Sequence, residues 1–209
     1  MIVGLPYDAE VEYLESTWTQ WIDTGVNAST SLVINCDFQF TNATGNQLNG
    51  TYGDSGRLQF GIVNGEWSVG IGTVGVSGAT ADVLRHSITI NVPQKQVLFD
   101  RINYGDYSSA SATYESYQHI WLFARTNTES KAPCRERIFS CAITSNNILV
   151  RSFVPVRVGS GANAVGYMYD RVTHKLFGNQ GTGAFVIGPD VAEPVMGLHF
   201  YPDGEESEP

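Results

Sequence analysis

Residues 31–40, SLVINCDFQF, alternate between apolar and polar side chains. A period of two places every second side chain on the same face of a β-strand, so this segment predicts a strand with one face in a core and the other in solvent. A helix of this sequence would scatter its apolar side chains around the helix axis. The residues on the predicted core face are Leu32, Ile34, Cys36, Phe38 and Phe40.

Strand-like segments recur along the chain, and clusters of Gly, Asn, Ser and Asp separate them. The chain has 22 glycines and only 16% charged residues, a composition that favours strands and turns over helices. Many short strands at this spacing predict an all-β sandwich or barrel. The further segments are RLQFGIV, EWSVGIG, LRHSITINV, KQVLFD, HIWLFAR, RIFSCAI, ILVRSFVPVRV and AVGYMYD.

The formal net charge of −9 argues against a nucleic-acid partner, because affinity for a phosphate backbone comes largely from clustered Lys and Arg. No run approaches the ~18 apolar residues that a membrane span needs, so no membrane insertion is expected. The start, MIVGLPYDAE, shows no secretory signal. Two interpretations of Cys134 and Cys141 stay open: they pair across a hairpin, or they fill core space as reduced thiols.

Three stretches suggest a family: LPYDAEVEYLESTWTQWIDTG, then IWLFAR with RIFSCAITSNNILVRSFVPVR, and then VGYMYDRVTHKLFGNQGTGAFVIGP. Over residues 5–189 the chain resembles the concanavalin A-like, laminin-G-like modules of gut bacteria and their phages. The resemblance implies a two-sheet antiparallel jelly-roll sandwich over residues 1–188. Residues 189–209, rich in proline with an acidic end, are predicted to form an extended tail that attaches the domain to a partner.

Within the first stretch, Trp18 stands where the family has a turn glycine, and Trp21 stands where it has tyrosine. The resemblance therefore places Trp18 on an exposed bend, where it either contacts a sugar or protein or folds back over its own loop. It makes Trp21 a packed aromatic residue. Asp23 and Asp170 look like residues that bond turn backbone.

Tyrosines mark a second candidate binding region, residues 104–117, YGDYSSASATYESY. Tyrosine with Ser, Ala and Gly is a composition typical of binding loops, although a strand pair whose tyrosines flank the core fits equally well. The neighbouring segment 41–56, TNATGNQLNGTYGDSG, reads as a loop that suits sugar hydroxyls and carries Tyr52. The tyrosines of the first region are Tyr104, Tyr107, Tyr114 and Tyr117.

Candidates for metal binding and catalysis are few. Laminin-G-like modules often bind Ca²⁺, and DRINYGD offers Asp100, Asn103 and Asp106 as oxygen ligands; the alternative is that no cofactor binds. Some relatives are glycoside hydrolases, but the alternating carboxylates that they use are missing here, so we expect no enzyme activity. His86 is in phase with Ile88 and is predicted to be a hydrogen-bonded core or rim residue.

Three functions remain open from the sequence. The first is a non-enzymatic, lectin-like recognition module of a phage virion, in a fibre, tail appendage or capsid decoration, that binds glycans or a host surface. The second is a purely structural virion protein that contacts other virion proteins or copies of itself. The third is an adhesin domain on a bacterial cell surface. The expected location is accordingly the virion or the bacterial surface.

Overall fold

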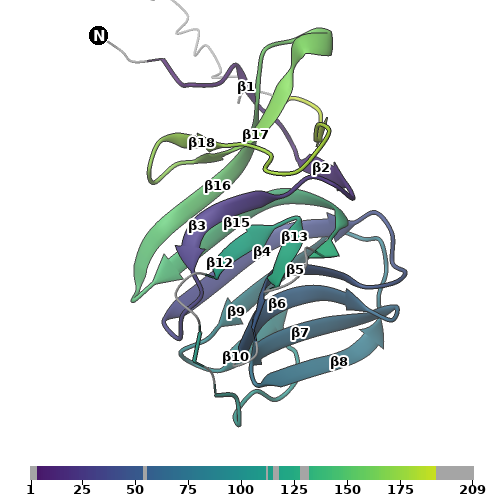
Figure 1. The fold of residues 1–209 in the computed structure, drawn as a ribbon, viewed down its shortest axis with the longest axis vertical. Coiled ribbons are helices and arrows are strands. Elements are labelled where there is room, and N and C mark those ends of the chain that lie inside the picture. Colours follow the sequence, from purple (N-terminus) through teal and green to yellow (C-terminus); the bar gives the residue numbers. More distant parts are fainter. Residues whose placement is uncertain (1–3, 54–55, 112, 115–117, 128–131, 192–209) are drawn as a thin grey trace, which may run out of the picture.

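The structure is a computed structural model, which describes residues 4–53, 56–111, 113–114, 118–127 and 132–191. Two β-sheets pack face to face, and β1, β17 and β18 lie together at one end of the molecule (Figure 1). The described residues include one turn of 3-10 helix, Gly161–Asn163, and no α-helix. The predicted all-β, two-sheet antiparallel sandwich is confirmed.

The large sheet has 11 strands. Its main path, in spatial order, is β11 (Ile102–Asn103), β10 (Gln96–Phe99), β9 (His86–Asn91), β4 (Leu32–Phe40), β15 (Arg135–Ser145), β16 (Ile148–Val158), β17 (Val165–Asp170) and β18 (Lys175–Phe177). Three short strands pair beside this path: β1 (Ala9–Glu10), β2 (Leu14–Thr17) and β19 (Val186–Ile187).

The small sheet has 8 strands. Its path is β14 (Ala132–Pro133), β13 (Ala124–Asn127), β5 (Gln47–Gly53), β6 (Gly56–Val63), β7 (Glu66–Gly72) and β8 (Val74–Thr80). Off this path, β12 (His119–Leu122) pairs with β5, and β3 (Ile22–Asn27) pairs with β12. The pair of β13 and β5 is parallel, an exception to the antiparallel pattern. Phe123, at φ 64°, interrupts the segment HIWLFAR and separates β12 from β13.

The core lies between the sheets and follows the predicted alternation. On β4 the five residues of the predicted core face are buried, and the intervening residues, Val33 among them, are partly or fully exposed. On β6, Leu58, Phe60 and Ile62 are buried in the core. Arg57 and Gln59 alternate with them and therefore lie on the opposite, outer face of the small sheet. The period of two thus separates the face of the strand that packs in the core from its outer face.

The prediction that residues 41–56 form a loop is wrong for residues 47–53, which form the central strand β5. Its core-facing side chains are polar: Gln47, Asn49 and Thr51 are fully buried. Each is hydrogen-bonded, with Thr51 donating to Gln118 at 3.2 Å and Asn49 donating to Glu136 at 2.7 Å. Because no apolar alternation marks this strand, a hydrophobicity pattern cannot identify it.

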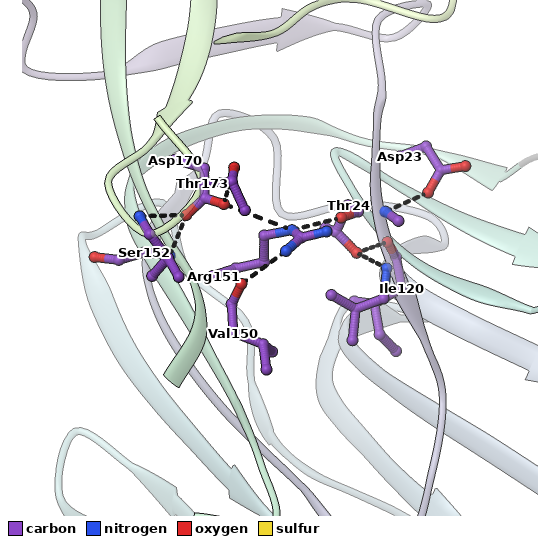
Figure 2. A network of polar contacts seen from close by, with 11 residues as sticks. Asp23, Thr24, Ile120, Val150, Arg151, Ser152, Asp170 and Thr173 are labelled. Atoms are coloured by element: carbon purple, nitrogen blue, oxygen red, sulfur yellow. Dashed lines mark hydrogen bonds and ion pairs between the residues drawn. The ribbon is translucent and has the colours of Figure 1, made fainter. Parts of the chain in front are cut away.

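A polar network joins the two sheets near β3 (Figure 2). Arg151 Nε donates to Thr24 O at 2.9 Å and lies 3.7 Å from a carboxylate oxygen of Asp170. Asp170 is fully buried and accepts the backbone N–H groups of Ser152 at 2.8 Å and Val172 at 3.1 Å. The predicted role of Asp170 in bonding turn backbone is confirmed.

The three cysteines are free and buried. Cys36 on β4 faces Cys141 on β15 in register. Cys134 and Cys141 are seven residues apart, and the extended strand β15 between them spans about 20 Å, far beyond the Cα distance that a disulfide bridges. The proposed pairing of Cys134 with Cys141 is therefore wrong, and the alternative of reduced thiols in the core is confirmed.

The end of the described chain runs beside the N-terminal segment. Glu12 N donates to Pro189 O at 2.8 Å, and Val191 N donates to Glu10 O at 2.9 Å. Asp190 accepts two hydrogen bonds from Arg157 at 2.7 and 2.6 Å. Residues 192–209, most of the predicted tail, lie outside the described residues, so their attachment role stays a prediction.

Candidate functional site

The outer face of the small sheet carries a row of paired residues that is largely glycine. Trp121 pairs with Gly50, Gly50 with Gln59, Gln59 with Gly70, and Gly70 with Gly75. Directly paired residues share a face of an antiparallel sheet, so all five positions lie on one surface. Three of the five positions are glycine, and each has close neighbours: Gly50 lies against the backbone of Leu58, and the side chain of Arg57 lies over Gly70 and Gly75.

A pocket of about 450 Å³ lies on this face, and we call it the outer-face pocket. Its size falls within the range of small-molecule binding sites. The described residues of its lining have hydroxyl, amide, guanidinium and aromatic groups but no carboxylate. The lining residues are Asn46, Leu48, Tyr52, Arg57, Gln59, Val63, Ser68, Gly75, Ser77 and Arg125.

The glycines allow Arg57 to lie across the neighbouring strands. A Cβ atom at Gly75 would approach Arg57 Nη1 to 2.7 Å, and one at Gly70 would overlap Arg57 Cδ. A side chain at either position would therefore displace the arginine. The segment EWSVGIG alternates large core residues with Ser68, Gly70 and Gly72. The small residue at position 70 leaves room for the side chain of Arg57 on the outer face.

Tyr52 lies between two arginines in this pocket. Its ring centroid is 5.5 Å from the guanidinium carbon of Arg57 and 4.9 Å from that of Arg125. Arg125 also donates to Gln59 Oε1 at 3.0 Å. Burial lowers the pKa of Arg125, the charge of Arg57 lowers it further, and Tyr52 and Cys134 oppose this change. The pocket therefore has positive charge in a partly desolvated setting.

Two stacked tryptophans border this row. The rings of Trp21 and Trp121 are 3.9 Å apart at an interplanar angle of 27°, and both side chains are half-buried. This stacking confirms Trp21 as a packed aromatic residue. Asp23, which pairs with Trp121, contacts His119 Nδ1 at 2.8 Å and accepts Gly25 N at 2.8 Å, so its predicted bond to turn backbone is also confirmed.

Trp18 lies on the exposed bend that the resemblance implies. Its φ of 115° is a conformation that glycine adopts easily and a bulky residue rarely does, and its side chain is 41% exposed. The guanidinium carbon of Arg135 is 5.4 Å from its ring centroid. Trp18 does not line the outer-face pocket, so the structure does not bring it together with Tyr52.

Three of the tyrosines of residues 104–117 contact the small sheet through their hydroxyl groups. Tyr104 donates to Trp67 O at 2.7 Å, Tyr107 to Val69 O at 3.1 Å, and Tyr114 to Arg57 O at 3.3 Å. Burial raises the pKa of all three.

Of these tyrosines, Tyr107 is only 1% exposed and offers no surface to a ligand. Tyr114 lines a separate pocket of about 310 Å³. Tyr117 lies outside the described residues. Of the tyrosines considered from the sequence, only Tyr52 lines the outer-face pocket.

The residues considered for Ca²⁺ bind separate protein groups. Asp100 accepts Ser87 N at 2.8 Å and contacts His86 Nδ1 at 2.6 Å, while Asp106 accepts Ser108 N at 2.9 Å. The amide of Asn103 donates to Gly105 O at 3.4 Å. In the part of the chain that the structure describes, no cluster of three or more His, Cys, Asp or Glu could hold a metal ion.

His86 also contacts Asp82 at 2.8 Å, in addition to Asp100. The prediction of a hydrogen-bonded rim residue is therefore confirmed.

Sequence reasoning missed Arg57, Gln59, Trp121 and Arg125. Arg57 and Gln59 are the polar positions of the alternating segment RLQFGIV, so the sequence alone could have predicted that both side chains lie on the face of the strand opposite the core. What the sequence did not reveal is that β5, β12 and β13 bring Trp121 and Arg125 to the same face.

The described residues include no helix with the length and apolar character needed to cross a membrane. No protein-family model matches the chain, and no curated protein matches its sequence.

Proposed function

We propose that this protein is a non-enzymatic carbohydrate-binding module that holds a glycan in the outer-face pocket. The observation that carries the proposal is the pocket of about 450 Å³ on the outer face of the small sheet, which Tyr52, Gln59 and Arg125 help to line. Around it lie the groups that sugars use. Hydroxyl and amide side chains pair with sugar hydroxyls, and aromatic rings pack against the apolar face of a sugar ring.

The lining of the pocket favours binding over hydrolysis. Glycosidases of the common type need two carboxyl groups that flank the bond to be cleaved, and the described residues that line this pocket include none. His119 and Asp23 form a pair on the same sheet, but one imidazole with one carboxylate lacks the second acid that such a reaction requires. The proposed activity is therefore recognition.

The proposed setting is a phage virion, and it rests on the resemblance of residues 5–189 to modules of gut bacteria and their phages. In that setting the module contacts a glycan on the host surface, and the C-terminal residues attach it to another virion protein or to a second copy of itself. A purely structural virion protein would bind no glycan, so a binding measurement separates the two functions.

A glycan array with neutral and acidic members tests the proposal, with titration calorimetry for the best ligands. Tyr52→Ala and Gln59→Ala should each weaken binding at least tenfold, since each removes a group that lines the pocket. Trp18→Ala is the matched aromatic control outside this pocket and should leave glycan binding unchanged. If no glycan binds, or if the pocket variants bind as the wild type does, the proposed function is wrong.

A further inference from the structure

The outer-face pocket contains two arginines that have no acidic partner among the described residues. Among the described residues, no carboxylate lies within ion-pair distance of Arg57 or Arg125. The chain has a formal net charge of −9, so acidic groups are plentiful. Five of the other seven arginines are ion-paired, namely Arg85, Arg137, Arg151, Arg157 and Arg171, whereas Arg101 and Arg135 have no ion pair with a described residue.

The hydrogen bonds of these two guanidinium groups are also incomplete. Arg125 Nη1 donates to Gln59 Oε1, but Arg125 Nε is buried and has no acceptor. No described residue accepts a hydrogen bond from the Arg57 side chain. Each guanidinium has five N–H donors, so most of the donor capacity of the pair remains available.

Both arginines lie beside Tyr52, and each charge acts on the other. Like charges close together in a partly desolvated site raise the free energy of the empty pocket, and an anion between them would remove this repulsion. A planar guanidinium binds carboxylate and sulfate oxygens through two parallel hydrogen bonds, which makes arginine the preferred residue for such groups.

From this arrangement we propose that the outer-face pocket is specific for acidic sugars and that Arg57 and Arg125 bind the carboxylate or sulfate group of one sugar unit. This inference rests on the proposed glycan-binding function and specifies its ligand class. The anionic group lies against the two guanidinium groups beside Tyr52. Ser77 and Asn46, which also line the pocket, bind hydroxyl groups of the same or the adjacent unit.

Titration calorimetry with matched saccharides tests the inference. One series is lactose, 3′-sialyllactose and 3′-sulfolactose, which share a neutral core and differ in the anionic group. The other is tetragalacturonate and its methyl ester. The acidic member of at least one series should bind at least tenfold more tightly than its neutral counterpart, and a preference for the sialylated or the sulfated ligand assigns the anion. Binding should weaken as salt concentration rises.

Arg57→Gln should reduce the preference for the acidic ligand to less than threefold. Arg57→Lys, which keeps the charge but lacks the planar fork, should retain part of it. Lys175→Gln is the matched control, because it removes the same charge from an exposed position on β18 in the other sheet. Arg125→Gln is the second test variant, and thermal melting shows whether each variant is folded.

Equal binding of acidic and neutral members, lost on Tyr52→Ala, would overturn the inference and leave the proposed function in place. An acidic preference that survives Arg57→Gln and Arg125→Gln would overturn it as well. Absence of binding by every saccharide in both series and on the array would overturn the proposed function itself.

Discussion

Replacement of Glu136 by glutamine is expected to make the protein more stable at neutral pH. Glu136 on β15 is fully buried between the sheets, and Asn49 Nδ2 donates to its Oε2 at 2.7 Å. Glu136 Oε1 and Asn49 Oδ1 have no hydrogen-bond donor. Both atoms are acceptors when the carboxyl is ionised, so a proton on Glu136 supplies the donor that they lack.

Burial raises the pKa of Glu136 from its ordinary 4.5 to about 8, although hydrogen bonds from Asn49 and Phe123 oppose the change. Between these two pH values the folded state binds a proton that the unfolded state has released, so stability falls as pH rises through this window. The loss amounts to roughly 3 kcal/mol at pH 7 and approaches about 5 kcal/mol above the folded pKa, at about 1.4 kcal/mol per pH unit.

Glutamine has nearly the same shape, keeps an oxygen for Asn49 Nδ2 and provides an N–H for Asn49 Oδ1. Glu136→Gln should therefore match the wild type near pH 4 and exceed its unfolding free energy by roughly 3 kcal/mol at pH 7. Urea unfolding at several pH values between 4 and 8 measures the difference. The matched control is Glu66→Gln, at an exposed position on β7.

His86 titrates in an overlapping range, since hydrogen bonds to Asp100 and Asp82 outweigh burial and raise its pKa. Its contribution is equal in the wild type and in Glu136→Gln, and it cancels in their difference. A difference between the two proteins that stays constant from pH 4 to pH 8 would refute the protonated-carboxyl argument.

Three further predictions concern other parts of the fold. The three buried cysteines should be unreactive toward a thiol reagent at pH 8 in the native protein, and all should react after unfolding. Burial raises the pKa of Cys134, and a hydrogen bond with Cys141 together with burial raises the pKa of Cys36. Reaction of any thiol in the native state would contradict this prediction. Trp18→Gly should be more stable to urea than Trp18→Ala by about 1 kcal/mol, since only glycine adopts a φ of 115° without strain; equal stabilities would show that the bend is unstrained. Asp170→Ala should lower the free energy of unfolding by about 3 kcal/mol, because it leaves Arg151 and two backbone N–H groups without their buried acceptor. A loss below about 1 kcal/mol in thermal or urea unfolding would contradict the structural role of the network in Figure 2.

The alternation of apolar residues predicted an all-β sandwich or barrel, because strands such as β4 and β6 bury one face in an apolar core, and the family resemblance narrowed this to a two-sheet sandwich. It failed for β5, whose buried side chains Gln47, Asn49 and Thr51 are polar. Their partners are far along the chain, with Glu136 bonded to Asn49 and Gln118 bonded to Thr51. A buried polar side chain is acceptable only where such a partner exists, and a local pattern does not contain that information.

The candidate site was predicted from tyrosine composition, which identified one lining residue, Tyr52. The tyrosines at 104, 107 and 114 have the same composition around them, but their hydroxyls bond backbone oxygens of β6 and β7. Composition does not distinguish a tyrosine that faces a ligand from one whose hydroxyl donates a hydrogen bond to a backbone carbonyl of a strand. The distinction depends on which face of which sheet the residue reaches.

The two faces of β5 have opposite roles. On the inner face, Asn49 forms the hydrogen bond to Glu136 that ties the small sheet to the large one. On the outer face, Gly50 and Tyr52 form part of the proposed binding surface. A strand with apolar side chains inside would gain stability from burial, whereas β5 depends on directional hydrogen bonds that fix its register. Such fixed register is what a binding surface needs, because a slip of one residue would turn Tyr52 into the core and Asn49 toward the ligand.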